Sequence, residues 1–532
     1  MAATEVKSEV LAFFRLQGYV LKSEATRFLC DTLAQFDSKL ERKEWLDRIL
    51  RALQNLPLEN SILDRETVEG AVKDCSRQGG VDEEQIFNVF DVFGVDRFVI
   101  DKSSGRYVRA TEKAKIFGEA SSKAQLYFER YELVKQRVKR HRLFQNRSNL
   151  SANSVQLDDG TEPKANFLLH TVGDLLAAPG NLNEIVVLGM LSQLKGDKYH
   201  LEDPDGHVEF SFENADFQSG FFCEGTMILA EGSYKPAERT FFAKAIGMPP
   251  AEDAKATSES MGNANSFGGE ERVSPRASEK LRRLEVERPN AMMVFVGDVH
   301  LDKEKTLEGI SRMFAGFEDS PPKCFVFAGD FCSEPYGEQH YDTVAEGFRS
   351  LAAIMERYPD LVNNSNFVFM PSKNDPGLGN ILPRPALPPT VTKAVLDRMP
   401  NCRFVSNPCR LRYCSQEIVL FREDLMQKLY RNALKTPHDP KQAPTQLART
   451  LAGQGHAWPL PLPAAPVFWE WDFALRLHPL PDLLVLFDAN EQYAVQATGM
   501  QVANPSSFSL NDLCFQVYFP ASRKVEDSAI TL

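Results

Sequence analysis

Residues 291–300 read Ala-Met-Met-Val-Phe-Val-Gly-Asp-Val-His, a short apolar run that ends in Gly297–Asp298–X–His300. A second apolar run, residues 324–328, ends in Gly329–Asp330. Open α/β sheets build their sites at the carboxyl ends of parallel strands. Carboxylate and imidazole ligands at such ends suit a two-metal centre that cleaves phosphoesters. The two runs therefore predict buried strands, and the rest of the chain decides whether the site is complete.

Further strands and helices follow these two runs. A helical pattern covers about 341–357, an apolar run covers 366–370, and another buried run covers 482–486. Two strands that are connected through a loop and a helix at this spacing lie parallel to each other in one sheet. The chain from residue 288 onward is therefore predicted to be an α/β domain.

Composition limits the class of protein. A chain of 532 residues with 43% hydrophobic and 25% charged residues is typical of globular proteins with roughly two to four domains. The net charge of −12 argues against a protein that coats nucleic acid over a broad surface, although a partner could supply a positive face. No apolar run is long enough to span a membrane, and the N-terminus lacks signal-peptide features. The nine scattered cysteines form no CxxC pair, which predicts reduced, buried packing residues in an intracellular protein.

The N-terminal residues 5–77 are predicted to form a small helical bundle. Ser38 and Glu41 match a capping box. The segment that follows carries apolar residues on one face at helical spacing: Trp45, Leu46, Ile49, Leu50 and Leu53. Such a bundle is either a plain folding unit or a docking module, and the sequence leaves both interpretations open.

Residues 78–165 give a mixed pattern. A dense apolar patch at 86–93 precedes a predicted hairpin formed by 98–100 and 107–108, and a strongly helical segment covers 122–144. That helix ends in a cluster of basic residues: Lys135, Arg137, Lys139, Arg140, His141 and Arg142. The cluster is interpreted either as a solvated helix face or as a nuclear-localisation or phosphate-contacting patch. Residues 146–162 are predicted to be a loop.

Residues 166–250 predict five short strands, with Asp205–Gly206 marking a hairpin. This pattern is typical of a small Greek-key barrel of the OB type. Many OB folds bind single strands through aromatic and basic residues. The predicted strands and their flanks instead carry acidic residues: Glu184, Glu202, Asp203, Glu209, Glu213 and Glu231. A protein-binding or structural barrel is therefore favoured. Residues 251–287, which include a weak phosphorylation motif at Ser274–Pro275, are predicted to be a linker or surface loop.

The two Gly-Asp motifs resemble the first two motifs of calcineurin-like metallophosphoesterases. In that family the Asp and His of the first motif hold one metal, and the Asp of the second bridges both metals. A Gly-Asn-His-[Asp/Glu] motif and a final Gly-His-X-His follow. In this sequence the place of the third motif is taken by Ser372–Lys373–Asn374–Asp375, and the place of the last motif by Phe487–Asp488–Ala489–Asn490. His456 is a candidate for an intermediate histidine.

These replacements predict that the metal centre is lost. A lysine ammonium at position 373 opposes a dication, and Asn374 cannot donate a proton at neutral pH. One alternative is a surviving one-metal site, and another is that Lys373 replaces the metal charge and holds Asp298 and Asp330 together. The residues of the predicted vestigial pocket are Asp298, His300, Asp330, Lys373, Asn374, His456, Asp488 and Asn490.

The order of helical head, OB barrel and metal-poor phosphodiesterase domain resembles the B-subunits of the replicative DNA polymerases. The segments 421–425, 454–461, 471–476 and 479–485 are similar to that family. Further motifs are similar to its epsilon branch: Ala230–Glu231–Gly232, Phe267–Gly268–Gly269, Ile381–Leu382–Pro383–Arg384–Pro385 and Asn407–Pro408–Cys409–Arg410.

The resemblance implies a multidomain α+β protein. Its parts would be a helical module similar to the lid of AAA+ ATPases at 1–77, a connector at 78–165, an OB fold at 166–250, a linker at 251–287 and an inactive phosphodiesterase-like domain at 288–532.

The resemblance also implies a non-catalytic, nuclear accessory subunit with no cofactor of its own, since zinc and any iron–sulfur cluster belong to the catalytic subunit. The implied partners are the C-terminal domain of the polymerase's catalytic subunit, the replicative helicase assembly (CMG/GINS) through the N-terminal module, and small histone-fold subunits. DNA would be contacted only indirectly or weakly, and a membrane not at all. Two rival functions remain open from the residues: an active phosphodiesterase acting on nucleic-acid ends, and a single-strand-binding OB protein.

Overall fold

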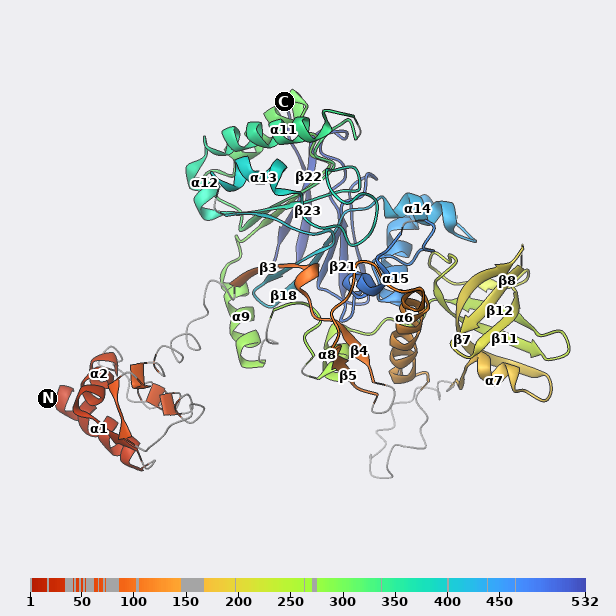
Figure 1. Cartoon of the computed structure of the whole chain (residues 1–532), viewed down its shortest axis with the longest axis horizontal. Coiled ribbons are helices and arrows are strands. Elements are labelled where there is room, and N and C mark those ends of the chain that lie inside the picture. The colour runs from red at the N-terminus through yellow and green to blue at the C-terminus, as the bar shows by residue number, and fades with distance from the viewer. Residues whose placement is uncertain are drawn as a thin grey trace. The chain divides into compact units, whose positions relative to one another are not determined.

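The computed structural model of the chain describes residues 2–16, 19–33, 42, 45–46, 49–50, 53, 62–65, 67–69, 72, 86–101, 105–144, 167–196, 198–262, 264–269, 275–335, 337–399, 401–437, 439–464 and 466–532 (Figure 1). The chain forms two compact units, Met1–Phe87 and Asn88–Leu532. No helix of the described ranges is both long and apolar enough to cross a membrane.

The first unit contains α1 (Ala2–Leu16) and α2 (Ser23–Leu33), and the apolar face predicted at 45–53 lies in its core. Its core residues are Val6, Val10, Phe14, Ala25, Leu29, Leu33, Leu46, Ile49, Leu50, Leu53, Leu63, Val68 and Val72. The all-helical prediction was wrong in one respect, because β1 (Val20–Leu21) pairs in parallel with β2 (Ile62–Leu63). Strands of two residues are too short to leave an alternating pattern in the sequence. The capping box at Ser38 and Glu41 lies outside the described residues.

The predicted OB barrel is confirmed in the second unit. Its strands are β7 (Leu182–Lys195), β8 (Lys198–Asp203), β9 (Gly206–Ser211), β11 (Met227–Lys235) and β12 (Thr240–Gly247). Antiparallel neighbours run from β9 through β8, β7 and β11 to β12, and the parallel pairing of β12 with β9 closes the barrel. Two short strands, β6 (Leu169–His170) and β10 (Asp216–Phe217), and the helix α7 (Val172–Leu176) complete it.

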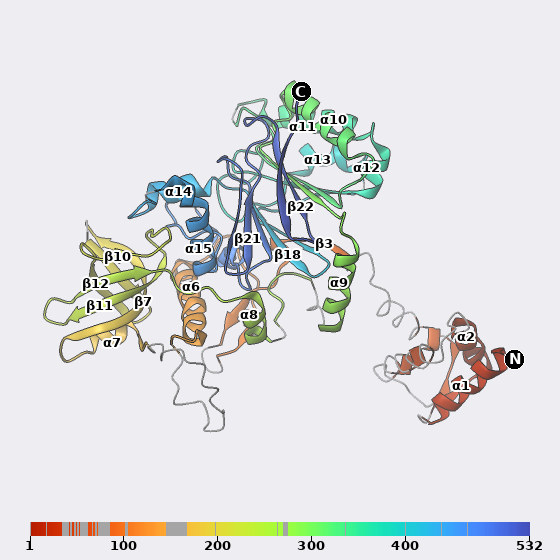
Figure 2. The same ribbon diagram turned by 180° about the vertical axis from the view of Figure 1, so that it is seen from behind.

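The C-terminal part is a pair of facing six-stranded sheets. The first has the order β16 (Cys402–Phe404), β15 (Asn366–Met370), β14 (Cys324–Ala328), β13 (Met293–Gly297), β22 (Cys514–Phe519) and β23 (Lys524–Ala529). The strands β13, β14, β15 and β16 are parallel, as the sequence predicts for the first three. One face packs on α10 (Glu304–Phe317), α11 (His340–Met355), α12 (Pro359–Asn364) and α13 (Pro389–Leu396), which lie together in the upper part of Figure 2.

The second sheet has the order β20 (Tyr493–Ala497), β21 (Met500–Asn504), β19 (Leu483–Leu486), β18 (Gln416–Phe421), β17 (Cys409–Tyr413) and β3 (Phe87–Asp91). It packs on α14 (Leu425–Asn432) and α15 (Ala443–Gln454). Contacts such as that between the rings of Phe295 and Phe487, 6.3 Å apart, join the two sheets. Figure 2 shows the two sheets from behind, with β22 and β21 in neighbouring layers.

The segment predicted as a connector is integral to this sandwich. Its apolar patch forms β3, the outer strand of the second sheet, where the Val92 amide donates to Ser406 Oγ over 3.0 Å. The predicted hairpin is confirmed as β4 (Phe98–Ile100) and β5 (Tyr107–Arg109). The predicted helix is α6 (Ala120–Arg140). An apolar patch shows that a segment is buried, but it does not show which distant strand will cover it.

Neither interpretation of the basic cluster at the end of α6 fits Arg137 or Arg140, although Arg142 of the same cluster is exposed. Arg137 is 2% exposed and donates to the carbonyl oxygens of Ala452 and Gly453. Arg140 makes two hydrogen bonds to the carboxylate of Glu252, at 2.9 and 2.7 Å. These guanidinium groups therefore join α6 to the rest of the unit instead of forming a free basic surface.

The predicted linker at 251–287 is largely structured. Asp253 caps α8 (Ala254–Met261), and α9 (Pro275–Glu287) follows. Between them, Phe267 is buried, and the carbonyls of Ser266 and Phe267 accept hydrogen bonds from Arg410. The low apolar content of this segment hid its structure, because part of it is held by side chains of distant strands, such as that of Arg410.

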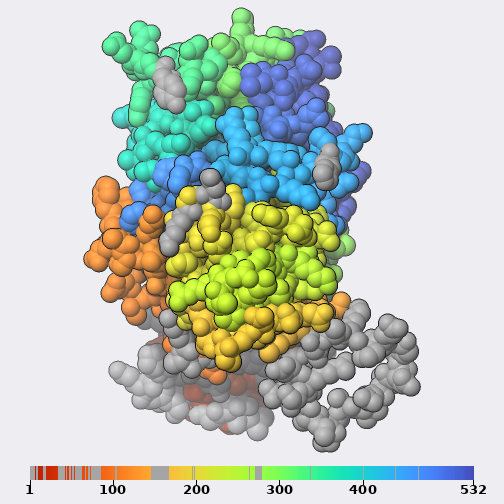
Figure 3. Space-filling view, turned by 90° about the vertical axis from the view of Figure 1, so that its right-hand side faces the viewer, coloured from red at the N-terminus to blue at the C-terminus, as the bar shows by residue number. Residues whose placement is uncertain are grey.

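The barrel and the sandwich are joined by side chains of α15. The Phe221 amide donates to Thr450 Oγ1 over 2.8 Å. The Gln454 side chain accepts from the Met227 amide at 2.9 Å and donates to the Met227 carbonyl at 2.7 Å. Figure 3 views this region with the yellow and green barrel in front and the blue and orange segments directly beside it. Both parts of the second unit therefore form one body.

Candidate functional site

The strand ends β13, β14, β15 and β18 meet at one edge of the sandwich, as predicted for the first three. An open cavity of about 600 Å³ lies there. Four of the predicted pocket residues line it: Asp298, His300, Asp330 and Asn374. Asp298 directly follows β13 and adopts a left-handed backbone conformation, with φ of 49°. The structure therefore brings residues of the first three motifs together at one cavity.

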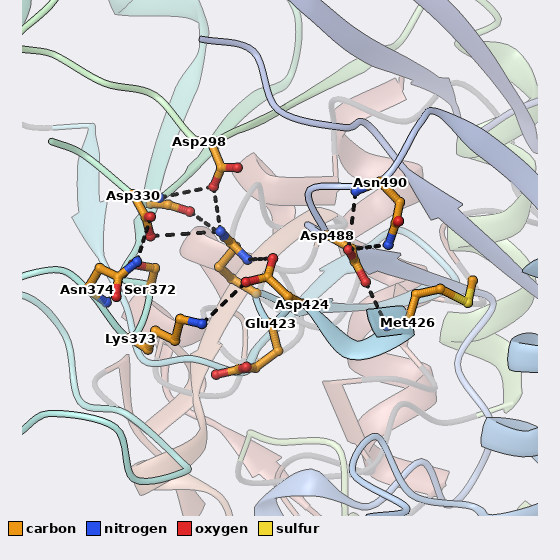
Figure 4. A network of polar contacts seen from close by, with 12 residues as sticks. Asp298, Asp330, Ser372, Lys373, Asn374, Glu423, Asp424, Met426, Asp488 and Asn490 are labelled. Atoms are coloured by element: carbon orange, nitrogen blue, oxygen red, sulfur yellow. Dashed lines mark hydrogen bonds and ion pairs between the residues drawn. The ribbon is translucent and has the colours of Figure 1, made fainter. Parts of the chain in front are cut away.

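A residue to which the sequence analysis gave no role, Arg422, holds these carboxylates together. It follows β18, and its side chain is 5% exposed. Its Nη2 donates to Asp298 Oδ1 over 2.6 Å and lies 3.8 Å from Asp330 Oδ1. Its Nη1 donates to Asp424 Oδ1 over 3.0 Å, and its Nε donates to the Gly329 carbonyl over 2.6 Å. Figure 4 shows Asp298, Asp330 and Asp424 gathered around these contacts.

Lys373 does not hold Asp298 and Asp330 together, so that hypothesis was wrong. Its Nζ lies 3.4 Å from Asp424 Oδ2, on the outer side of the cluster. Asn374 donates from Nδ2 to Asp330 Oδ2 over 2.8 Å. The planar guanidinium of Arg422 can donate to several carboxylates at once, which a single ammonium cannot do in the same geometry.

Burial and the ion pairs shift the pKa values of this cluster in opposite directions. Burial alone would lower the pKa of Arg422, but the carboxylates of Asp298, Asp424 and Asp330 outweigh it and raise that pKa. Burial likewise opposes the ionisation of Asp424, but Arg422 and then Lys373 lower its pKa to about 2. Burial raises the pKa of Asp298, against the effect of Arg422. The guanidinium is therefore a permanent positive charge at the centre of the site.

Asp375, which stands in the acidic position of the third motif, shapes the loop that carries Asp330. Its two oxygens accept from the Phe331 and Ser372 amides, each over 2.8 Å. A side chain at position 329 would lie 1.8 Å from Asp375 Oδ2, so only glycine fits there. Burial raises the pKa of Asp375 to about 6.

The residues of the last motif support the first turn of a helix. Asp488 Oδ2 accepts from the Met426 amide in the first turn of α14 over 2.9 Å. Its Oδ1 accepts from the Asn490 amide and side chain, at 3.2 and 2.6 Å (Figure 4). Carboxylates at the first turn of a helix satisfy its unpaired amides. Burial raises the pKa of Asp488 to about 6.

His456 is not part of the site, so its assignment as an intermediate ligand was wrong. It is buried beside η4 (Trp469–Leu475), where Nε2 lies 3.3 Å from Asp472 Oδ1. Its Nδ1 accepts from the Trp458 amide over 3.0 Å. Burial, reinforced by Arg130, lowers its pKa. A histidine that follows a Gly can match a motif by spacing alone while its ring packs elsewhere.

The residues present do not fit a two-metal centre. A dication bound to Asp298 and Asp330 would lie beside the guanidinium of Arg422, whose Nη2 already occupies a lone pair of Asp298. Within the described ranges, no group of three or more His, Cys, Asp or Glu side chains is arranged to hold a metal ion. The sequence did contain one indication that Arg422 and Asp424 belong to the site. Both directly follow a buried strand, as metal ligands do in such sheets.

Three family profiles match the chain. The profile of the B subunit of DNA polymerases alpha and epsilon matches residues 293–495. "DNA polymerase epsilon subunit 2-like, OB-fold domain" matches 120–250, and "DNA polymerases epsilon N terminal" matches 2–75. Among solved structures, an archaeal phosphodiesterase covers 45% of this chain at 10% identity with a TM-score of 0.26, which is too low to support a conclusion about the fold.

Full-length relatives come from animals and plants. "DNA polymerase epsilon subunit 2" of Mus musculus is 39% identical over 100% of this chain and 99% of its own length. The Drosophila melanogaster protein of that name is 34% identical over 99% and 98% of the two chains. The B subunit of DNA polymerase epsilon from Arabidopsis thaliana is 33% identical over 99% and 100%.

Proposed function

The chain belongs to the DNA polymerase epsilon subunit 2 family, and on that premise we propose that it is the non-catalytic accessory (B) subunit of a nuclear DNA polymerase epsilon. One observation carries the non-catalytic part of the proposal. The Arg422 guanidinium, 5% exposed, fills the space between the carboxylates of Asp298, Asp330 and Asp424. A charge that is fixed there supports the fold, but it cannot activate water as a metal does.

The OB barrel and the sandwich together are proposed to bind the C-terminal domain of the catalytic subunit. Their connection through Thr450 and Gln454 supports this proposal, because a partner that spans two parts needs those parts to be held in a fixed geometry. The sandwich is proposed to descend from a calcineurin-like phosphoesterase. Any zinc or iron–sulfur cluster is proposed to belong to the catalytic subunit, and this chain to need no cofactor.

The first unit is proposed to be a helical module similar to the AAA+ lid that contacts the replicative helicase assembly (CMG/GINS). It forms its own core, with α1 and α2 among its elements, which supports a separate role. Small histone-fold subunits are proposed to belong to the same complex. Contact with DNA is proposed to be indirect or weak, in keeping with the net charge of −12.

Copurification with the C-terminal domain of the catalytic subunit tests the scaffolding role. The full chain and a chain that lacks residues 1–77 are expected to retain that domain equally. Loss of binding on deletion would refute the assignment of binding to the barrel and the sandwich.

A phosphodiesterase assay tests the non-catalytic role. With manganese present, the full chain is expected to hydrolyse bis-p-nitrophenyl phosphate no faster than an Asp330→Asn variant. Hydrolysis that the substitution abolishes would instead establish an active enzyme.

A further inference from the structure

A short segment just before β11 is shared between two hydrophobic cores of the second unit. Phe221 and Cys223 are fully buried in the core that the second sheet forms with α14 and α15. Phe222, between them, is buried instead in the core of the barrel. Figures 1 and 2 show α14 and α15 between the barrel and the sheet that contains β21. Residues 221–223 therefore belong to the barrel and to the sandwich at once, like a strand between two layers.

Backbone contacts strengthen this junction. Cys223 and Ala433 form an isolated antiparallel bridge, and the Leu434 amide donates to the Phe222 carbonyl over 2.9 Å. In this pattern the two bridged residues lie directly opposite each other in a non-hydrogen-bonded pair, where facing side chains lie closest together. The chain that follows α14 is therefore a short strand neighbour of the barrel segment.

The first residue of β11, Met227, has a strand neighbour on one side only. The Leu191 amide of β7 donates to the Thr226 carbonyl over 2.9 Å. Because backbone groups alternate in direction along a strand, Met227 turns its own amide and carbonyl away from β7. These two groups therefore need partners on the side of β12.

β12 cannot supply both of these partners. Its pairing with β11 ends where Gly247 lies opposite Leu229. Continuing this register by two residues places Pro249 opposite Met227. Proline has no amide hydrogen and cannot donate to the Met227 carbonyl. A buried carbonyl without a donor is costly, so the donor must come from another part of the chain.

The side chain of Gln454, at the end of α15, takes the place of the missing strand neighbour. Its Oε1 accepts from the Met227 amide over 2.9 Å, and its Nε2 donates to the Met227 carbonyl over 2.7 Å. Two residues in a hydrogen-bonded antiparallel pair exchange the same two bonds. Gln454 is 7% exposed, and α15 packs on the second sheet of the sandwich. One side-chain amide from the sandwich therefore completes the sheet of the barrel.

We propose that Gln454 is a positioning residue for partner binding. Its amide fixes the orientation of the barrel relative to the sandwich, and a partner that contacts both parts requires that orientation. The partner is the C-terminal domain of the catalytic subunit, so this inference rests on the proposed function. A junction that is rigid in the free protein avoids the entropic cost of ordering it on binding. Loss of the two bonds therefore weakens binding, although Gln454 itself is buried.

The affinity of the full chain for the purified C-terminal domain of the catalytic subunit tests this role. Gln454→Met keeps the length of the side chain but removes both hydrogen bonds, and it is expected to weaken binding about tenfold.

Gln416→Met is the matched control. Gln416 is fully buried, accepts from the Tyr518 hydroxyl over 2.6 Å and donates to the Pro520 carbonyl over 2.8 Å, but it lies within the sandwich. The control is expected to lower the melting temperature at least as much as Gln454→Met and to leave the affinity unchanged.

A distance measurement separates positioning from a general loss of stability. Spin labels are attached to p-acetylphenylalanine, which replaces Lys244 on the barrel and Arg349 on α11, both of them exposed. Double electron–electron resonance on the free chain is expected to give one narrow distance distribution for the wild type and for Gln416→Met. Gln454→Met is expected to broaden that distribution, because the barrel then lacks its link to α15. An unchanged distribution would contradict the positioning role.

A covalent link tests whether a fixed orientation is what Gln454 supplies. Ala433→Cys places a second thiol directly opposite Cys223, so that oxidised glutathione can form a disulfide across the junction. In the Gln454→Met background, the oxidised chain is expected to bind within about twofold of the wild type. The same chain is expected to bind weakly again after reduction. A disulfide that forms but does not restore the affinity would overturn the positioning role.

The outcomes separate the positioning role from the scaffolding role. If the wild-type chain binds the domain and Gln454→Met binds equally well, the positioning role is overturned while the scaffolding role stands. If Gln416→Met weakens binding as much as Gln454→Met does, the loss reflects stability in general and the positioning role is overturned as well. If the wild-type chain does not bind the domain, the scaffolding role falls, and the positioning role falls with it.

Discussion

Arg422 changes what the strand-end carboxylates do. In a metal centre, such carboxylates bind an exchangeable ion that also carries out chemistry. Here a covalently attached cation lies 2.6 Å from Asp298 and 3.0 Å from Asp424. A buried charge whose partner is removed costs much more than the pair contributes when it is intact. The guanidinium therefore supplies the counter-charge of this cluster, and the chain depends on a single side chain for it.

Replacing Arg422 by alanine is expected to lower the unfolding free energy of the second unit by about 3–5 kcal/mol, because three carboxylates then lose their buried counter-charge. Urea denaturation of the full chain measures this. Lys373→Ala is the control, with an expected loss of about 1 kcal/mol or less, because that ammonium is 31% exposed. Manganese is expected to raise the melting temperature of Arg422→Ala more than that of the wild type. Equal stability of Arg422→Ala and wild type would contradict the assigned role.

Asp375 is expected to make the second unit less stable as the pH rises. A salt-bridged carboxylate, whose pKa is lowered, has the opposite effect. Its folded pKa of about 6 lies above the ordinary value of 3.8, so the folded state binds the extra proton between these values. The stabilisation is present at low pH and is lost as pH rises through about 6.

The stability difference between wild type and Asp375→Asn is therefore expected to shrink by about 2 kcal/mol from about pH 4.5 to pH 7. Asp424→Asn is the control. Its folded pKa of about 2 places its titration below this window, so its difference from wild type is expected to stay constant. A constant difference for Asp375→Asn as well would show that its carboxyl group is not buried as described.

At the scale of elements, the sequence predicted those strands that follow from the local pattern of apolar residues and turns. The apolar runs at 293–297, 324–328 and 366–370 are parallel strands, and the five barrel strands stand where alternation and turns placed them. The site was predicted only in part. The third and last motifs predict the loss of metal ligands, but they give no sign of Arg422, the cation between the carboxylates, which follows β18, 124 positions after Asp298. Spacing along the chain carries no information about such a contact.

The same limit explains the basic cluster of α6. Charge runs are usually solvated, yet Arg137 reaches the last turn of α15 and donates to the carbonyls of Ala452 and Gly453. The last carbonyls of a helix have no partner within the helix and need a donor from elsewhere. In sequence, Arg137 cannot be told from its exposed neighbour Lys139, because their burial depends on a helix more than 300 positions away.

Arg137→Ala is therefore expected to destabilise the second unit by about 2–4 kcal/mol, because it leaves two buried carbonyls unpaired. Lys139→Ala, two positions along the same helix and exposed, is the matched control with an expected change within about 0.5 kcal/mol. Thermal or urea unfolding of both variants measures the contrast. If the two variants behave alike, the cluster is a solvated face after all.

At the scale of the whole molecule, the outer strand of the second sheet comes from a segment that precedes the barrel in the sequence. β3 pairs with β17, so the barrel, α6 and the first sheet's parallel strands are all inserted between neighbouring strands of one sheet. Asp91 accepts from the Ser406 amide at 3.0 Å and from the Phe93 amide at 2.9 Å, which fixes the end of β3. A boundary drawn after the barrel would cut this sheet.

A chain that starts at residue 86 is expected to unfold in one cooperative transition like that of the second unit in the full chain. A chain that starts at residue 95 loses β3 and the buried Val92, and is expected to be less stable by about 3 kcal/mol or more. Differential scanning calorimetry of both chains measures this. Identical melting of the two chains would show that β3 adds nothing to the sandwich.

The pairing of β3 also has a consequence during synthesis. The Val92 amide bonds to Ser406, 314 positions later. At about 5–20 residues per second, a ribosome needs roughly 15–60 s to make that length of chain. During this time β3 has left the ribosome, but its neighbour β17 has not yet been synthesised. The barrel, which lies between them in the sequence, can already fold. Nascent chains of this protein therefore carry an unpaired strand edge, which makes them candidates for chaperone binding until residue 413 has emerged.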